Sequence, residues 1–482
     1  MFSTDAKQPS QTEPLAAGIA PSLASAVLLW TACVLPASPA RGDDVVLDWN
    51  ATMTDVLRDN TSLQNPGMAS RTMAMMNLAI YDAFAMTSPG GTMFYNYGQG
   101  RQSPGINAST DAAAAQAAYT VLSSIYGDQS STLDAALAAS LGDIADGQHK
   151  SDGVALGTSI GQSIIANRQN DGYDTSVQYL PTNAPGHWQP DPLNPGQEAW
   201  GPAWGDVLPF AIESGTQFMP PPMPELTSQK YTDAFNEVKE KGVATGSTRL
   251  PDETEAGIFW AYDRVGMGTP MRLYNDAMRN VAEQEGNSPE QNAELFAKAS
   301  VAVADAGITA WNSKFAYDFW RPVTGIREAD TDGNDDTIAI PDWTPLGAPG
   351  GDDNDFTPPF PTYLSGHATF GGALFEMLKQ FYGRDDIAFS LDSEELADAG
   401  YSDITREFSS FSEAMAENGR SRVYLGIHWN FDDTVAQVTG AQVAQYLATS
   451  PFIASVPEPS SAACLAIAAA LTAPRRRRRR AA

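Results

Sequence analysis

Apolar residues recur every three to four positions along much of this 482-residue chain, a spacing typical of helices with one buried face. The pattern predicts helices over residues 66–86, 111–125, 131–145, 153–168, 254–264, 270–284 and 290–312. No series of segments alternates apolar and polar residues in the way that the strands of a half-buried sheet do. The sequence therefore predicts an all-α protein composed of helical bundles.

Two long segments interrupt the helical pattern. Residues 169–228 are rich in Pro, Gly and Trp, and we interpret them as an ordered connection that closes an N-terminal helical half, residues 41–228. A C-terminal helical bundle is expected at residues 229–450. The second irregular segment, residues 328–363, contains the acidic run Asp330–Asp336. A solvated acidic turn is the favoured interpretation, and a calcium loop stays an alternative although the closing Glu of an EF-hand is missing.

The two ends of the chain differ from its body. Residues 1–40 contain an apolar stretch followed by small residues, which indicates a secretory signal peptide, with an uncleaved anchor as the alternative. Residues 456–482 contain Pro-Glu-Pro, a short apolar run and six arginines, an order that resembles the PEP-CTERM sorting tail of exported bacterial proteins. That resemblance implies exosortase-type sorting machinery as a partner, while a plain C-terminal anchor stays open. We expect an exported protein of the cell envelope or the extracellular space.

Charge and cysteine content narrow the possible functions. The formal net charge of −29 repels nucleic acid and anionic membranes, so we expect no nucleic-acid partner. Any anion site must be built locally from a few basic side chains. Both cysteines, Cys33 and Cys464, lie in the two ends, which leaves the body without a disulfide framework or thiolate chemistry.

The tripeptide Ser365-Gly366-His367 begins a further stretch of helical spacing. Ser365 is a favourable N-cap, and Gly366 allows a ligand to approach the backbone. Free N–H groups in the first turn of such a helix suit an anion. A histidine in this position is more often structural than catalytic, so the tripeptide alone does not establish a site.

A second segment, WNSKFAYDFWRP, places two cations among aromatic residues. Lys314 and Arg321 are seven positions apart, so we expect both on one face of a helix that Pro322 ends. Long cationic side chains usually extend to solvent from such a helix. The proline directly after Arg321 instead favours a fixed position for its side chain.

A third segment, ENGRSRVYLGIHWNFDD, contains a histidine and a carboxylate four positions apart. We expect one helix to carry both His428 and Asp432, with the carboxylate orienting the ring, and Arg422 in the preceding turn. A surface ion pair is the simpler interpretation of Arg422 and Asp432. Taken together, the three segments hold the residue types that bind a tetrahedral oxyanion, either phosphate or vanadate. No thiolate or carboxylate cluster for a divalent metal accompanies them.

The spacing K-x6-R-P, then S-G-H, then S-R-x5-H-x3-D resembles the superfamily shared by vanadium haloperoxidases and type 2 phosphatidic-acid phosphatases. The likeness to vanadium chloroperoxidases extends over roughly residues 250–435. It includes FWAYD (259–263), DFWRPVTGIR (318–327) and PPFPTYLSGHATFGGALF (358–375). Leu364 departs from the family, which usually has proline before Ser-Gly-His.

The resemblance implies a vanadate cofactor and a role for each matching residue. His428 corresponds to the histidine that bonds vanadium, Asp432 to the partner that holds its tautomer, and His367 to the acid–base histidine. The cations Lys314, Arg321 and Arg422 correspond to those that neutralise the vanadate oxygens. The remaining matches are hydrogen-bond donation by Ser365 and the Gly366 backbone, and pairing of Asp263 with the second arginine.

The resemblance also implies a reaction. Hydrogen peroxide oxidises a halide to hypohalous acid, which halogenates small organic substrates. Trp311 and Phe360 match the apolar halide-pocket residues of chloroperoxidases, which favours a chloroperoxidase-like site, with simple core packing as the alternative for both residues. We expect the halide to be chloride or bromide. An acid phosphatase that uses His428 as the nucleophile, through a phosphohistidine, is the alternative. His149 and His187 are not expected to take part in catalysis, and the sequence leaves the oligomeric state open.

Overall fold

The computed structural model describes residues 44–450, apart from 61–64, 95–106, 351–354 and 402–403. The signal peptide and the sorting tail predicted for residues 1–40 and 456–482 lie outside the described residues. Among the helices of the described part, none is long and apolar enough to cross a membrane.

Helices dominate the described residues and confirm the predicted fold class. The α-helices are α1 (Val45–Asp59), α2 (Pro66–Thr87), α3 (Thr110–Ile125), α4 (Ser130–Gly142), α5 (Gln148–Arg168), α6 (Gln229–Lys241), α7 (Pro251–Phe259), α8 (Pro270–Glu285), α9 (Pro289–Tyr317), α10 (Pro322–Arg327), α11 (Gly366–Tyr382), α12 (Glu394–Asp398), α13 (Phe411–Tyr424) and α14 (Asn430–Thr449). Three short 3-10 turns accompany them: η1 (Gly127–Gln129), η2 (Trp204–Asp206) and η3 (Ala329–Thr331). The antiparallel strands are β1 (Phe389–Asp392) and β2 (Thr405–Phe408).

Each helix predicted from apolar spacing is present, with ends that differ from the prediction by up to five residues. The irregular segments 169–228 and 328–363 are confirmed as well, since their regular structure in the described residues is limited to η2 and η3. The strands β1 and β2 were not predicted. Each has only four residues, which is too short for alternation of apolar and polar positions to be recognised.

The prediction that one helix carries both Lys314 and Arg321 is wrong. Helix α9 ends at Tyr317, and Asp318 follows in the left-handed conformation with φ 52°. Arg321 is instead the N-cap of α10, and Pro322 begins that helix rather than ending α9. Proline is favoured at the first helical position because the N–H it lacks would have no intrahelical acceptor.

The prediction that one helix carries both His428 and Asp432 is also wrong. Helix α14 begins at Asn430 with Trp429 as its N-cap, so His428 lies in the turn between α13 and α14. Asp432 is the third residue of α14, and its carboxylate accepts a hydrogen bond of 3.0 Å from the Trp429 backbone N–H. An acidic side chain at this position satisfies a backbone donor that the helix leaves free.

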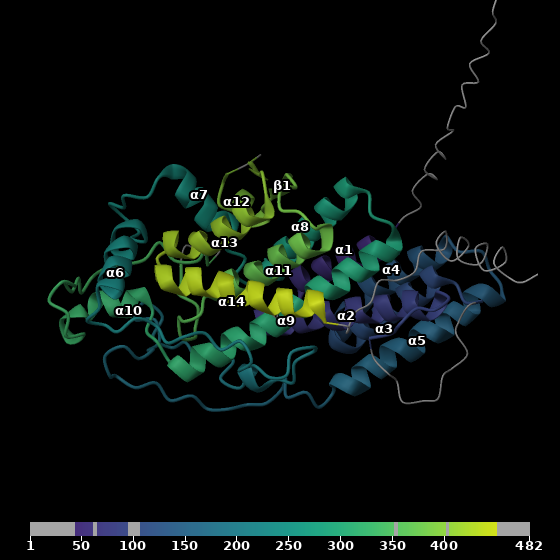
Figure 1. The fold of residues 1–482 in the computed structure, drawn as a ribbon, viewed down its shortest axis with the longest axis horizontal. Helices are drawn as coiled ribbons and strands as arrows, with labels where there is room; N and C mark the ends of the chain where they lie inside the picture. Colours follow the sequence, from purple (N-terminus) through teal and green to yellow (C-terminus); the bar gives the residue numbers. More distant parts are fainter. Residues whose placement is uncertain (1–43, 61–64, 95–106, 351–354, 402–403, 451–482) are drawn as a thin grey trace, which may run out of the picture. The chain divides into compact units, whose positions relative to one another are not determined.

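One hydrophobic core contains helices from both predicted halves of the chain. The long helix α9 packs against α2 on one side and against α11 and α14 on the other, and Figure 1 shows α9 beside α14 in its green and yellow part. A second buried cluster, which includes Phe235 and Trp429, connects α6 and α10 to the start of α14. The turns before α10, α11 and α14 therefore project from a close-packed helical support.

Helices α11 and α14 approach closely because glycines lie at their contact. A Cβ atom on Gly440 would be 2.1 Å from the Thr369 carbonyl oxygen, and one on Gly372 would be 2.5 Å from the Gln437 carbonyl oxygen. These neighbours are backbone atoms, which cannot move aside as a flexible side chain does. The contact fixes the first turns of α11 relative to the middle of α14.

We expect Gly440→Ala to destabilise the protein by about 1–3 kcal/mol, because the added methyl group separates two packed helices. The free energy of unfolding in a denaturant titration measures this effect. Gly142→Ala is the matched control, since a Cβ atom there meets nothing within 4 Å at the end of α4. Equal stability of the Gly440 variant and the parent would show that the contact can relax.

Candidate active site

The residues predicted to form an oxyanion site lie together where several helices begin or end. Lys314 comes from the last turn of α9, Arg321 from the N-cap of α10 and Arg422 from the last turn of α13. Ser365 is the N-cap of α11, as predicted. His428 precedes α14, and the charges of Arg321, Lys314 and Arg422 all act on it.

Lys314 is fully buried and donates hydrogen bonds to three backbone carbonyls. Its Nζ lies 3.0 Å from the carbonyl oxygens of Pro361 and Thr362 and 2.5 Å from that of Leu364. Burial and the nearby Arg321 lower the pKa of Lys314 well below its ordinary value. The three acceptors oppose this shift because only an ammonium has three hydrogens to donate. Lys314 thus holds the loop before α11. To donate a hydrogen bond to an oxyanion, its ammonium group would have to give up one of the three carbonyl acceptors.

Arg321 determines which ring nitrogen of His428 is unprotonated. Its Nη1 lies 3.0 Å from His428 Nε2 and donates to the Ile427 carbonyl at 2.8 Å. A guanidinium can only donate, so Nε2 must be the acceptor and the proton must be on Nδ1. Burial and the nearby cations, Arg321 first, lower the pKa of His428 well below its ordinary value, which keeps the ring neutral.

Asp432 and Thr362 hold the other side of this imidazole. His428 Nδ1 lies 3.0 Å from Asp432 Oδ2 and also 3.0 Å from the Thr362 hydroxyl. That hydroxyl donates a short hydrogen bond to Asp432 Oδ2. Burial raises the pKa of Asp432 to about 7, whereas the hydrogen bonds from Thr362 and the Trp429 backbone lower it. The carboxylate thereby fixes both the tautomer and the direction of the ring.

The first turn of α11 supplies hydrogen-bond donors and a neutral histidine. Ser365 Oγ accepts from the Ala368 N–H at 3.4 Å, and the N–H groups of Gly366 and His367 have no intrahelical acceptor at this position. His367 Nε2 lies 2.9 Å from the Ala261 carbonyl oxygen, which can only accept, so Nδ1 is the free base. Burial, assisted by the charge of Arg422, lowers the pKa of His367 to about 4.

Arg422 pairs with Asp263 through a short hydrogen bond from Nη2 to Oδ2. The Arg422 side chain is 1% exposed and that of Asp263 is 14% exposed, so solvent screens the pair only from the aspartate side. The Nε and Nη1 atoms of Arg422 are buried without a hydrogen-bond partner, and so is Nη2 of Arg321. Buried donors of this kind are costly unless a ligand accepts from them.

An aromatic wall borders the cations. The ring centroids of Trp311 and Phe360 are 5.1 Å apart, and Lys314 and Arg321 lie 4.9 and 5.0 Å from the Phe360 centroid. Trp200 extends this wall, with its ring centroid 5.1 Å from that of Trp311 and 6.3 Å from that of Phe360. Apolar rings beside the cations exclude water and strengthen the local electrostatic field.

The chain is similar to known proteins along most of its length. It is 30% identical to the vanadium chloroperoxidase of Curvularia inaequalis, in a match that covers 81% of this chain and 79% of that protein. The chain belongs to the vanadium haloperoxidase family. The model of the vanadium chloroperoxidase second helical-bundle domain matches residues 294–472, which include all three site segments.

Two solved bacterial structures share the fold of this haloperoxidase-family protein. The first bacterial vanadium-dependent iodoperoxidase is 25% identical, with a TM-score of 0.70 over 85% of this chain and 97% of that one. A holo bacterial vanadium-dependent chloroperoxidase is 17% identical, with a TM-score of 0.62 over 83% of this chain and 95% of that one.

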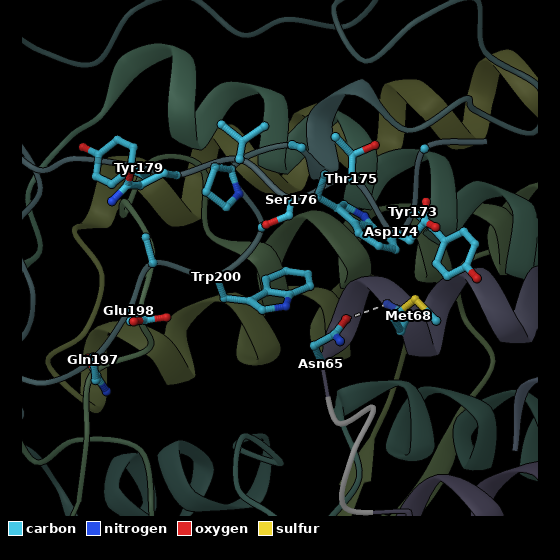
Figure 2. A pocket seen from close by; sticks show the side chains of 18 of the residues that line it. Asn65, Met68, Tyr173, Asp174, Thr175, Ser176, Tyr179, Gln197, Glu198 and Trp200 are labelled. Carbon is cyan, nitrogen blue, oxygen red and sulfur yellow. Dashed lines mark hydrogen bonds between the residues drawn. The ribbon is translucent and has the colours of Figure 1, made fainter. Parts of the chain in front are cut away.

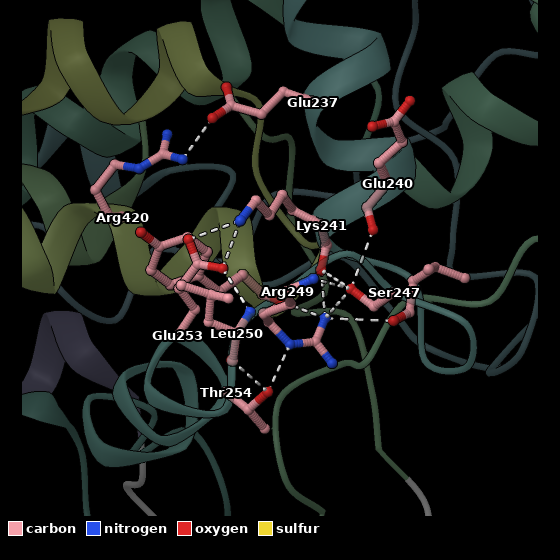
Figure 3. Close-up of polar contacts among 11 residues, drawn as sticks. Glu237, Glu240, Lys241, Ser247, Arg249, Leu250, Glu253, Thr254 and Arg420 are labelled. Carbon is pink, nitrogen blue, oxygen red and sulfur yellow. Dashed lines mark hydrogen bonds and ion pairs between the residues drawn. The ribbon is translucent and has the colours of Figure 1, made fainter.

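A polar network supports the helix that presents Arg422 in this haloperoxidase-family fold (Figure 3). Arg249 Nη1 donates to the Tyr424 carbonyl at 3.1 Å, at the last residue of α13. Arg420, two positions before Arg422, pairs with Glu237 of α6 at 2.5 Å. These contacts hold the C-terminal turn of α13 and the beginning of the segment that connects α13 to His428.

Several sequence candidates lie outside the site. His149 is exposed, and His187 pairs with Asp318 at 2.8 Å. In the acidic run, Asp332 accepts hydrogen bonds from Asn334 and Thr337, which form a local turn. Groups of three or more His, Cys, Asp or Glu that could hold a metal ion are absent from the described residues.

Sequence reasoning missed two residues of the site, Thr362 and Trp200. Thr362 lies between Phe360 and Ser365, within a segment that resembles the family, but a hydroxyl has no sequence signal that identifies its partner. Trp200 belongs to the irregular segment 169–228, whose Trp-rich composition does not indicate a position in space. Its backbone N–H donates to the Pro359 carbonyl at 2.9 Å, which brings this distant segment to the site.

The lowered pKa of His367 predicts a pH dependence of stability for the vanadate-free protein. The unfolded chain binds this proton near pH 6.5 and the folded chain only near pH 4, so the contribution of His367 to stability falls as the pH drops between these values. The loss attributable to this residue is about 3 kcal/mol. Denaturant titrations from pH 7 to pH 4 should show a smaller decrease for His367→Gln than for the parent.

The exposed His149 provides the control for this measurement, because His149→Gln should keep the pH dependence of the parent. A His367 variant with the same pH dependence as the parent would mean that the ring is solvated and protonates normally.

Proposed function

We propose that this chain is an exported vanadate-dependent haloperoxidase that oxidises chloride or bromide with hydrogen peroxide to hypohalous acid, which halogenates organic substrates. The observation that carries the proposal is a set of three buried, unpartnered N–H donors around a neutral imidazole. Arg321 supplies one donor and Arg422 two, and His428 Nε2 is unprotonated between fixed neighbours. Membership in the vanadium haloperoxidase family supports the same conclusion.

The residues fit a vanadate ion. Arg321 Nη2, Arg422 Nε and Arg422 Nη1 would donate to its oxygens, together with the first-turn N–H groups of α11. His428 Nε2 would bond the metal after giving up the hydrogen bond that it accepts from Arg321 Nη1, since a histidine ligand must be neutral and is oriented by the hydrogen bond at its other nitrogen. When bound, vanadate supplies a Lewis acid that activates hydrogen peroxide toward attack by halide.

The chain's own groups divide the remaining tasks. His367 is neutral over the physiological pH range and presents Nδ1 as a proton acceptor, because Nε2 donates to Ala261. It is therefore suited to take a proton from hydrogen peroxide. Lys314 holds the loop from Pro361 to Leu364 and contributes positive charge beside the anion. The Arg422–Asp263 pair fixes the direction of the guanidinium.

Trp311 and Phe360 are the proposed halide-side residues. Their rings cover Lys314, whose Nζ lies 5.6 Å from the Trp311 ring centroid and 4.9 Å from the Phe360 centroid. An anion drawn by this cation must pass an apolar surface and lose part of its hydration shell. A halide that has lost part of its hydration shell is a stronger nucleophile, which supports oxidation of the halides that are harder to oxidise, chloride and bromide.

An acid phosphatase is the alternative function, and one observation favours it as well. An unprotonated Nε2 held by a carboxylate is also what a phosphohistidine mechanism requires. Because one oxyanion pocket suits both reactions, the two functions must be separated by experiment.

Purified protein loaded with orthovanadate should oxidise bromide and iodide in the presence of hydrogen peroxide, measured by bromination of a phenolic dye and by triiodide absorbance. Hydrolysis of a phosphate ester by the vanadate-free protein should be weak. Robust ester hydrolysis without any halide oxidation after vanadate loading would overturn the proposal in favour of the phosphatase.

The same preparation tests the anion-binding role of Arg422. Because Arg422→Ala removes two unpartnered donors and one charge, we expect the vanadate Kd to rise at least about tenfold. Arg384→Ala is the matched control, since that arginine is half exposed and pairs with Glu285. A vanadate Kd that is equal in the two variants would remove Arg422 from the binding site.

Export rests on the sequence of the two ends, and we propose it on that basis alone. N-terminal sequencing of the protein from its native cells should find cleavage near Ala40. An intact N-terminus on cytoplasmic protein would contradict export.

A further inference from the structure

A cavity of about 650 Å³ lies beside the site and is not used by the proposed oxidation of halide. Two irregular stretches, residues 172–181 and 197–204, form most of its lining, together with Asn65 and Met68 at the start of α2. Figure 2 shows the indole of Trp200 in the middle of these side chains, facing the stretch that carries Ser176. None of the proposed vanadate-binding residues lines this cavity.

Trp200 is a common wall of the cavity and the proposed halide pocket. It lines the cavity, and its ring meets Trp311 edge-to-face at 83° with centroids 5.1 Å apart. Phe360 touches the same indole at a centroid distance of 6.3 Å. Hypohalous acid formed beside Trp311 and Phe360 would therefore be released one aromatic ring away from the cavity.

The chain is shaped to keep Trp200 in this place. A Cβ atom on Gly67 would lie 2.8 Å from the Trp200 ring and 2.4 Å from the Trp204 ring. Gly201 has φ +79°, and a Cβ atom there would lie 2.7 Å from the Trp311 ring. Glycine at both positions leaves room for the indoles to pack, so the wall is part of the folded structure and not a chance contact.

The lining of the cavity is aromatic and acidic. Trp200 provides an aromatic face, and Asp174 and Glu198 provide carboxylates, whereas the ring of Tyr173 is stacked on the Arg71 guanidinium at 4.1 Å. No Lys, Arg or His belongs to the lining that the described residues form. A positively charged or neutral aromatic molecule suits such a surface, because its ring can pack on the indole and its cation can approach the carboxylates. A carboxylate-bearing molecule is repelled.

We propose that this cavity binds the organic substrate, and that the substrate class is an electron-rich aromatic ring bearing an amine. This inference rests on the proposed function, because the hypohalous acid HOX comes from that reaction. In the halogenation step a ring carbon forms a bond to X while the X–O bond breaks. The ring then loses its proton, which combines with the released hydroxide to give water, so that ArH and HOX yield ArX and H2O.

Tyramine and 4-hydroxyphenylacetate are matched probes, since both are para-substituted phenols that differ in the charge of the side chain. Reagent hypobromite gives the intrinsic ratio of ring bromination for the two compounds, counted after thiosulfate has returned any N-bromoamine to the free amine. The vanadate-loaded enzyme, supplied with bromide and peroxide, should favour tyramine about fivefold or more beyond that ratio. Raised salt should reduce the preference because it screens exposed charges.

The double variant Asp174→Asn, Glu198→Gln should bring the ratio of the two rates close to the reagent value. Its control is the double variant Asp386→Asn, Glu213→Gln, which removes two exposed carboxylates that do not line the cavity and should keep the parent ratio. Triiodide formation, measured on every sample, reports the oxidation of halide separately.

Calorimetric titration of tyramine without peroxide or halide gives a readout that needs no turnover. Binding by the parent and loss of binding in the Asp174, Glu198 variant support the cavity as the substrate site. If the enzyme forms triiodide but brominates tyramine and 4-hydroxyphenylacetate in the same ratio as reagent hypobromite, this inference is overturned. The proposed function is not affected by that result. Absence of triiodide overturns the proposed function, and the titration then decides alone whether the cavity binds the amine.

Discussion

The rest of the site depends on one electrostatic constraint, which is that three cations are buried with too few counter-charges. Lys314, Arg321 and Arg422 are each no more than 1% exposed. Asp432 and Asp263 are the carboxylates that act on them most directly. Burial of an uncompensated charge is costly, so the arrangement is stable only where other groups share the charge or an anion joins it. Backbone carbonyls share the charge of Lys314 and Arg321 by accepting hydrogen bonds. The guanidinium donors that have no partner remain available to an anion.

Those carbonyls come from loops, and the helical core determines where the loops lie. Lys314 takes its acceptors from the stretch before α11, and Arg321 takes one from Phe360 and another from Ile427. Each of these loops begins or ends a helix that packs in the core, so a shift in the helices would displace the acceptors. The glycine contact between α11 and α14 therefore affects the electrostatics of the pocket, although none of its atoms touches a cation.

Residue types and spacing predicted three segments that meet in the fold, and the family resemblance added Asp263, Trp311 and Phe360. Residue types and spacing were insufficient to predict the helices that carry these side chains. Helical spacing of Lys314 and Arg321 suggested one continuous helix, but Asp318 adopts a left-handed conformation and the chain turns before Pro322. Side-chain partners reached from distant segments, such as Trp200, leave no local periodic signal, and only the fold brings them to the site.

The same constraint connects stability to function. Each buried donor without a partner costs about 1–3 kcal/mol, so a pocket organised in advance for an oxyanion makes the folded protein less stable than its core alone would allow. A large core shared by α2, α9, α11 and α14 can tolerate that cost, whereas a small domain could not. An anion that accepts hydrogen bonds from these donors removes this cost, and the free energy that is recovered contributes to the binding affinity of the anion. Phosphate and vanadate can both accept from the donors, so selection between the two ions depends on other groups. Under the proposed function these are the unprotonated Nε2 of His428, which can bond vanadium as a further ligand, the neutral imidazole of His367 and the aromatic wall of Trp311, Phe360 and Trp200.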